Sequence, residues 1–157
     1  MFSSQSKSSN VPGLRSGFVA GDASVLKDFL LYRTYHGTAL SPSVQAASVA
    51  AWSDEAHVVA NRALYAAKFD QATPVIQGAL ACRRPDAAFY LWAATPIDDA
   101  EYARRLYAAT NVTVLPGSYL SRTVDGASPG AGHVRIALVA SPAEVAEAAG
   151  RIASFTP

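Results

Sequence analysis

The stretch "SSQSKSSNVPGLRSGFVAGD", residues 3 to 22, decides which fold this chain can adopt. It places Lys7 among serines and Arg15 eight residues later, in a segment whose Ser, Asn, Pro and Gly content predicts a loop. The apolar run "GFVAG" at residues 17–21 is bounded by glycines, which is typical of a short buried strand. Such a strand needs neighbours along its edges and cover on its faces, and we expect the residues before it to supply neither. The first third of the chain is therefore expected to belong to a larger sheet.

Helices and strands alternate along the rest of the chain. Apolar spacing and end signals predict helices over residues 22–35, from 41 onward, from 53 to about 70, over 98–110 and from 141 to about 155. Strands are predicted within 87–95, 112–117 and 133–140. This alternation favours an α/β or α+β fold.

Four helix starts carry a recognisable cap. Asp22 precedes one apolar helix, and Ser41 followed by proline starts another. The pairs Asp98 with Glu101 and Ser141 with Glu144 each have the spacing of a capping box.

Composition excludes several classes of protein. The 157 residues are 50% hydrophobic, which is enough for one hydrophobic core with a smaller second cluster. The net charge of +1 is too small to attract nucleic acid or an anionic membrane electrostatically. No apolar run approaches a membrane span or a signal peptide, and the single Cys82 fits a reducing compartment. The three histidines lack metal-ligand spacing. We expect a soluble cytoplasmic protein with no bound metal.

The opening stretch resembles the S-x-S-K-x-S-N-x-P-G-x-R-x-G segment of fold-type I aminotransferases, which use pyridoxal 5′-phosphate. The runs "LLYRTYHGTALSPSVQAASVAAW", "DAAFYLWA", "NVTVLPGSYLSR" and "GHVRIALVASPAE" follow in the order found in bacterial succinyldiaminopimelate transaminases. The resemblance covers essentially the whole chain but corresponds to the C-terminal half of such an enzyme. It implies part of a PLP-transferase fold, with residues 1–70 a remnant of the three-layer large domain and its interdomain helix. Residues 71–157 would be the small C-terminal domain.

The resemblance also implies roles for four residues. Lys7 would supply the amine that forms an imine with the cofactor aldehyde and would then move the proton at the substrate Cα. Ser4 and Arg15 would hold the cofactor phosphate, and Arg135 in "GHVRIALV" would bind the substrate α-carboxylate. The turn at Tyr35 and His36 would line a neighbour's pocket in a homodimer. The implied substrates are an amino acid and a 2-oxo acid.

Other interpretations of the same residues stay open at this point. Lys7 and Arg15 could be solvated surface charges, and Arg135 could pair with an acidic side chain. The aromatic residues Phe89, Tyr90 and Trp92 are expected in the core, and His57 in solvent.

The sequence also departs from the family pattern. Gln5 and Ser8 stand where Leu and Arg are common. The residues that would stack on the pyridine ring and protonate its nitrogen belong to the half of the enzyme that the resemblance does not cover, so the isolated chain is expected barely to catalyse. The alternatives are another amino acid aminotransferase, a C–S lyase, or a non-catalytic fragment that serves as an interaction module.

Overall fold

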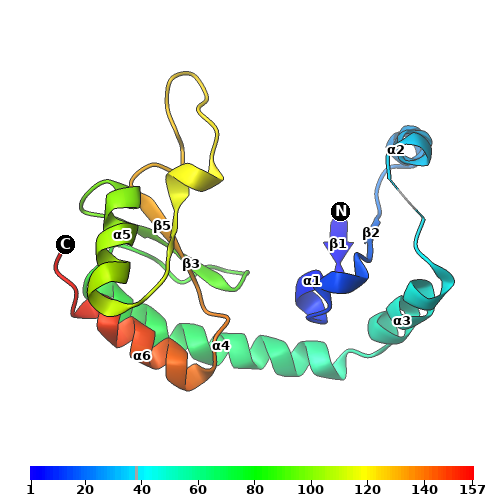
Figure 1. Ribbon diagram of the computed structural model, residues 1–157. Helices are drawn as coiled ribbons and strands as arrows, with labels where there is room; N and C mark the ends of the chain where they lie inside the picture. Colours follow the sequence, from blue (N-terminus) through cyan, green and yellow to red (C-terminus); the bar gives the residue numbers. More distant parts are fainter. Residues whose placement is uncertain (38) are drawn as a thin grey trace. The chain divides into compact units, whose positions relative to one another are not determined.

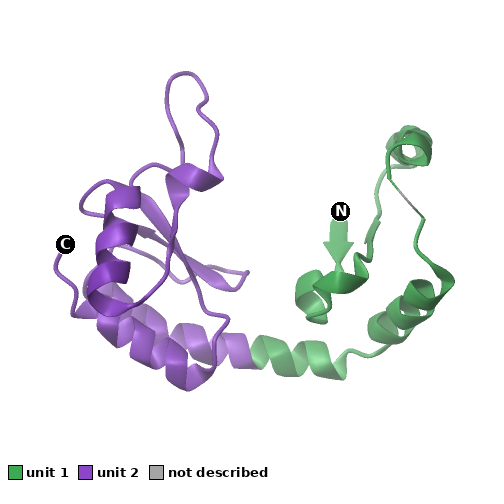
Figure 2. Cartoon of the chain, in the orientation of Figure 1, with its two compact units in different colours: residues 1–63 green, residues 64–157 purple. Residues whose placement is uncertain are grey.

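The computed structural model describes residues 1–37 and 39–157. They form two compact units, residues 1–63 and residues 64–157, shown in two colours in Figure 2. Each unit mixes helices with a small sheet, as the alternation in the sequence predicts. Both the division at residue 63 and the expected one at residue 70 fall inside helix α4, Ala56–Gln77.

Unit 1 begins with two paired strands. Figure 1 labels these strands, β1, Phe2–Ser4, and β2, Gly17–Val19. They run antiparallel, and Ser4 pairs with Gly17. The expectation that no upstream residue pairs with the 17–21 run is therefore wrong, because the first residues of the chain extend alongside it. The strand is not buried either, since Phe18 is 41% exposed. Gly17 allows the strands to approach, because a Cβ there would lie 2.5 Å from the Ser3 carbonyl oxygen.

The segment between these strands is helical rather than an open loop. α1, Gln5–Ser8, makes one turn that contains Lys7, and the 3₁₀ turn η1, Pro12–Leu14, follows it. The Gln5 amide donates to the Ser16 carbonyl at 3.1 Å, which continues the strand pairing by one residue. The prediction of an open loop is wrong, because the strand pair and the Gln5–Ser16 bond hold the two ends of the segment together. With its ends held, the chain between them can form these short turns.

Two helices follow the strand pair in unit 1. In α2, Ala23–Tyr35, the Asp22 carboxylate accepts from the Ser24 amide, and in α3, Pro42–Ser53, the Ser41 hydroxyl accepts from the Val44 amide. Both predicted caps are confirmed. α2 contributes no buried residue to unit 1, although its apolar side chains recur at helical spacing.

α4 continues beyond its expected end near residue 70 and through Pro74. A proline inside a helix removes one backbone hydrogen bond, which is why the sequence suggests a stop there. The helix persists because Ala72 and Ile76, on its last turns, are fully buried in the core of unit 2. Burial of apolar surface outweighs the local cost of the proline.

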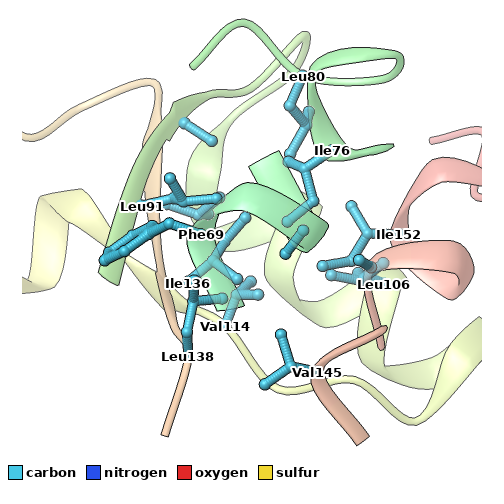
Figure 3. Close-up of a cluster of buried hydrophobic side chains, with 14 of the residues drawn as sticks. Phe69, Ile76, Leu80, Leu91, Leu106, Val114, Ile136, Leu138, Val145 and Ile152 are labelled. Carbon is cyan, nitrogen blue, oxygen red and sulfur yellow. The ribbon is translucent and has the colours of Figure 1, made fainter. Parts of the chain in front are cut away.

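Unit 2 contains a three-stranded antiparallel sheet in the order β3–β5–β4. The strands are β3, Tyr90–Ala94; β4, Leu115–Pro116; and β5, His133–Ala137. All three lie inside the predicted ranges, and β4 is only two residues long. Alternate residues of β3 and β5 are buried, so one face of the sheet packs into the core that Figure 3 shows.

Two capped helices supply much of that core. α5, Asp99–Thr110, buries Tyr102 and Leu106, and α6, Pro142–Ala153, buries Val145, Ala149 and Ile152. The capping box of α6 is complete, as predicted. That of α5 is half formed: Asp98 accepts from the Glu101 amide, while the Glu101 carboxylate pairs with two arginines of its own helix. None of the described helices is long and apolar enough to cross a membrane.

Candidate cofactor and substrate sites

Ser4, Lys7 and Arg15 lie in one short segment of unit 1. Ser4 ends β1 opposite Gly17, Lys7 lies in α1, and Arg15 follows η1. The two turns pack against each other, and the strand pairing closes the segment at its base. The three residues that the resemblance assigns to the cofactor thus belong to one strand–turn–strand segment, and all three are exposed.

Arg15 has a backbone conformation that is uncommon for a residue with a side chain. Its φ of 52° lies in the left-handed region, and its amide donates to the Pro12 carbonyl at 3.3 Å. The guanidinium Nη1 donates to the same carbonyl at 3.0 Å, which uses one of its five donors. The backbone and the side chain of Arg15 are therefore both held by η1.

The donors of this segment fit pyridoxal phosphate. A primary amine can condense with an aldehyde, and guanidinium and hydroxyl groups both donate hydrogen bonds that a phosphate dianion accepts. No cluster of histidine, cysteine, aspartate or glutamate among residues 1–37 and 39–157 could hold a metal ion. The side chains of Ser4, Lys7 and Arg15 are thus of the types that could hold an organic phosphate.

Gln5, which departs from the family pattern, anchors the start of α1. Its side chain is completely buried, and Nε2 donates to the Ser48 carbonyl of α3 at 2.9 Å. The Ser48 hydroxyl in turn donates to the Ser16 hydroxyl at 2.7 Å. Gln5 Oε1 is buried without a hydrogen-bond partner in the described part of the chain. The Gln5 amide therefore forms a directed, buried bond between α1 and α3.

The side chain of His57 is 35% exposed, so it contacts solvent as expected, but it also makes two hydrogen bonds that were not predicted. Its Nε2 lies 3.0 Å from the Ser9 hydroxyl, and its Nδ1 lies 3.0 Å from Asp54 Oδ2. The hydrogen bond with His57, followed by one from the Ala56 amide, lowers the pKa of Asp54 below its usual value. No local sequence signal marks the contact between His57 and Ser9, because the two residues are 48 positions apart.

Arg135 lies in unit 2, in the middle of β5. Its pairing partners are Trp92 on β3 and Leu115 on β4, and its Cζ lies 5.6 Å from the centre of the Tyr90 ring. Arg135 forms no ion pair within residues 1–37 and 39–157, and its Nε is buried without a hydrogen-bond partner there. A buried guanidinium N–H that lacks an acceptor is suited to binding an anion.

Tyr90 and Trp92 do not lie in the core, contrary to expectation. Because side chains alternate along a strand, Leu91 and Ala93 occupy the buried face and leave Tyr90 and Trp92 on the outer face with Arg135. Trp92 is 37% exposed and stacks on His133, with ring centres 5.5 Å apart and planes 12° apart. Arg135 thus shares a face of the sheet with aromatic side chains, one of which, Tyr90, lies under its guanidinium.

Asp99 was not predicted and positions the segment that leads into β5. This buried carboxylate accepts from the Ser118 amide at 2.8 Å and from the Gly132 amide at 3.4 Å. Burial raises its pKa, but bonds from the backbone and side chain of Ser118 and from the Gly132 backbone outweigh burial, so the pKa is lowered overall. Asp99 therefore stays ionised and fixes the backbone close to Arg135.

Tyr35 and His36 end α2. Tyr35 is 79% exposed, and the His36 ring stacks on Tyr32 with centres 4.4 Å apart and planes 7° apart. Their expected place in a neighbouring subunit's pocket stays a prediction.

Unit 2 also contains a groove of 350 Å³ between α6, the end of β5 and the segment that precedes β4. Glu144, Glu147 and Arg151 line it together with apolar side chains. None of the predicted site residues lies in this groove, so it is separate from the candidate substrate site at Arg135.

The family to which the chain belongs follows from comparison with known proteins. The model of the family "Aminotransferase class I and II" matches residues 1–152. A probable aminotransferase of Mycobacterium tuberculosis is 37% identical over 150 residues, which are 95% of this chain and 34% of that protein.

Solved structures agree with this match. A crystal structure of an aminotransferase from Neisseria meningitidis is 55% identical with a TM-score of 0.89, over 98% of this chain and 39% of the other. A probable N-succinyldiaminopimelate aminotransferase from Thermus thermophilus is 31% identical with a TM-score of 0.83, over 97% of this chain and 40% of the other. The chain thus spans about two fifths of the length of these solved relatives. It has part of the PLP-transferase fold and belongs to the class I and II aminotransferases, a family of enzymes that depend on pyridoxal 5′-phosphate.

Proposed function

We propose that this chain is the C-terminal part of a transaminase that moves an amino group between N-succinyl-LL-2,6-diaminopimelate and 2-oxoglutarate in lysine biosynthesis. The observation that supports it most is that Ser4 at the end of β1, Lys7 in α1 and Arg15 after η1 lie in one segment closed by the β1–β2 pair. The diamino substrate is proposed from the likeness to the probable N-succinyldiaminopimelate aminotransferase. A cytoplasmic homodimer, with residues 1–70 in the large domain and 71–157 as the small domain, is part of the same proposal.

Each site residue would have a distinct task in this reaction. When bound, pyridoxal phosphate supplies an aldehyde that reacts with amines and an aromatic ring that accepts electrons. The Lys7 amine holds the cofactor and carries a proton to or from the substrate Cα. Ser4 and Arg15 bind the phosphate, and Arg135 binds a substrate carboxylate through parallel N–H donors, which orients the bond that must break.

The proposal is tested by labelling lysines with pyridoxal phosphate, followed by borohydride reduction and peptide mass spectrometry. The chain has three lysines, Lys7, Lys27 and Lys68. We expect Lys7 to be labelled roughly tenfold faster than exposed Lys27, because one charge-assisted phosphate contact is worth about that factor. Inorganic phosphate should reduce this preference, as should the Arg15→Ala substitution.

Lys7→Ala should abolish the preferred label, while the matched Lys27→Ala substitution should leave it unchanged. Equal labelling of Lys7 and Lys27 in the unaltered chain would contradict the proposal and favour the non-catalytic interaction module. In the full-length enzyme, consumption of the amino donor without transfer to 2-oxoglutarate would favour a C–S lyase instead.

Arg135→Lys should weaken binding of 2-oxoglutarate by roughly tenfold or more, because an ammonium group cannot reproduce the two parallel N–H donors of a guanidinium. Titration calorimetry on the intact chain measures the affinity. Labelling of Lys7 should not change, and the exposed Arg122→Lys substitution in the same unit should have no effect. Equal losses of carboxylate binding and of Lys7 labelling would indicate a structural role for Arg135.

A further inference from the structure

We infer that His57 is a positioning residue that acts through Ser9 on the helical turn containing Lys7. The inference rests on the proposed function, in which Lys7 carries the cofactor. Ser9 directly follows α1 and caps its C-terminal end, and its amide donates to the Gln5 carbonyl at 3.2 Å. The hydrogen bond between His57 and Ser9 thus joins α1 to the start of α4 across 48 residues of sequence.

The orientation of the His57 ring is fixed from its other side. A carboxylate only accepts hydrogen bonds, so the Nδ1 that faces Asp54 must carry a proton. In the neutral ring Nε2 is then an acceptor, and the Ser9 hydroxyl donates to it. Asp54 is itself held, because its Oδ1 accepts from the Ala56 amide at 2.9 Å. Asp54, His57 and Ser9 therefore form one directed chain of hydrogen bonds, with both bonds of the ring at 3.0 Å.

The turn needs such external support. α1 is four residues long, and a single helical turn does not stabilise itself in water. Gln5 holds its first residue through the buried bond to Ser48, and His57 holds the residue that follows its last. Lys7 lies between these two supports in the chain. If either of these hydrogen bonds is removed, the turn is held less firmly and the Lys7 amine samples more conformations. Fewer of these conformations then place the amine in a reactive geometry toward an aldehyde.

Substitutions at His57 separate this role from general stability. The glutamine amide oxygen can take the place of Nε2 and accept from Ser9, whereas the shorter asparagine can reach Asp54 only. We expect His57→Ala, His57→Asn and Ser9→Ala each to slow pyridoxal phosphate labelling of Lys7 roughly tenfold, the factor that one hydrogen bond is worth. His57→Gln should restore the rate. Labelling of Lys27 should be the same in all variants.

Two controls complete the experiment. His36→Ala removes another histidine of unit 1, one that stacks on Tyr32, and should leave Lys7 labelling unchanged. Amide hydrogen exchange of residues 5–10 should be faster in Ser9→Ala, a variant that loses only a hydroxyl group and leaves the core of both units intact.

The outcomes distinguish this inference from the function on which it rests. Unchanged Lys7 labelling and unchanged exchange in Ser9→Ala would overturn the role of His57. The same holds if asparagine restores labelling as well as glutamine does. If Lys7 is not preferred over Lys27 in the unaltered chain, the proposed function fails, and faster exchange in Ser9→Ala would still show that His57 supports the turn.

Discussion

Replacing Asp99 with alanine should lower the free energy of unfolding of unit 2 by about 3 kcal/mol, because two backbone N–H groups lose their acceptor and each costs roughly 1–3 kcal/mol when left unsatisfied. These groups belong to Ser118 and Gly132, on either side of the loop that leads into β5. Urea unfolding followed by Trp92 fluorescence measures the effect in a Trp52→Phe background, because Trp52 is the other tryptophan of the chain. The neighbouring Asp98→Asn substitution, which keeps a good helix cap, should change stability little.

The pH dependence gives an independent check on Asp99. Its pKa in the folded chain is lowered from the ordinary value of 3.8, so its contribution to stability is present above that value and is lost as the pH falls through the folded pKa. Asp99→Asn should therefore remove part of the acid sensitivity of unit 2 below about pH 4. An acid limb identical in Asp99→Asn and in the unaltered chain would contradict the hydrogen-bonding role described above.

Leu106→Ala should destabilise unit 2 by about 2–5 kcal/mol, the range for emptying a leucine site in a packed core. Leu106 is 0% exposed and lies on α5, where it is part of the cluster formed with α4, α6 and the sheet. The same urea experiment measures the loss. Leu120→Ala is the matched control, because Leu120 is 47% exposed and its truncation should have little effect. A loss below 1 kcal/mol at Leu106 would show that the core can collapse around the gap.

Features encoded by a few neighbouring residues could be predicted from the sequence. The caps at Asp22, Ser41 and Ser141 lie where the sequence indicates, because a cap involves a side chain and a backbone amide two or three residues away. The strand containing Arg135 was also located correctly. β1 was missed because Ser3 and Ser4 belong to a stretch whose composition predicts a loop, and only pairing with residues 17–19 makes Phe2–Ser4 a strand.

The candidate site shows the same limit. The spacing of Lys7 and Arg15 identifies a family motif in the sequence, and the structure adds how the segment is held. Its supports join Gln5 to Ser48 and His57 to Ser9, over separations of 43 and 48 residues. No local pattern encodes such contacts. The placement of Trp92 outside the core likewise depends on which face of β3 turns inward, which a run of consecutive apolar residues does not specify.

The closed base of the Lys7 segment links ligand capture to folding. The strand pair at Ser4 and Gly17 and an anion bridging Ser4 and Arg15 would restrain the same stretch of backbone. By mass action, anion binding and pairing of the two strands then stabilise each other. An anion at one hundred times its dissociation constant would add about 2.7 kcal/mol to the stability of this hairpin. If pyridoxal phosphate is that anion, as proposed above, proteolysis of residues 1–19 should slow as its concentration rises.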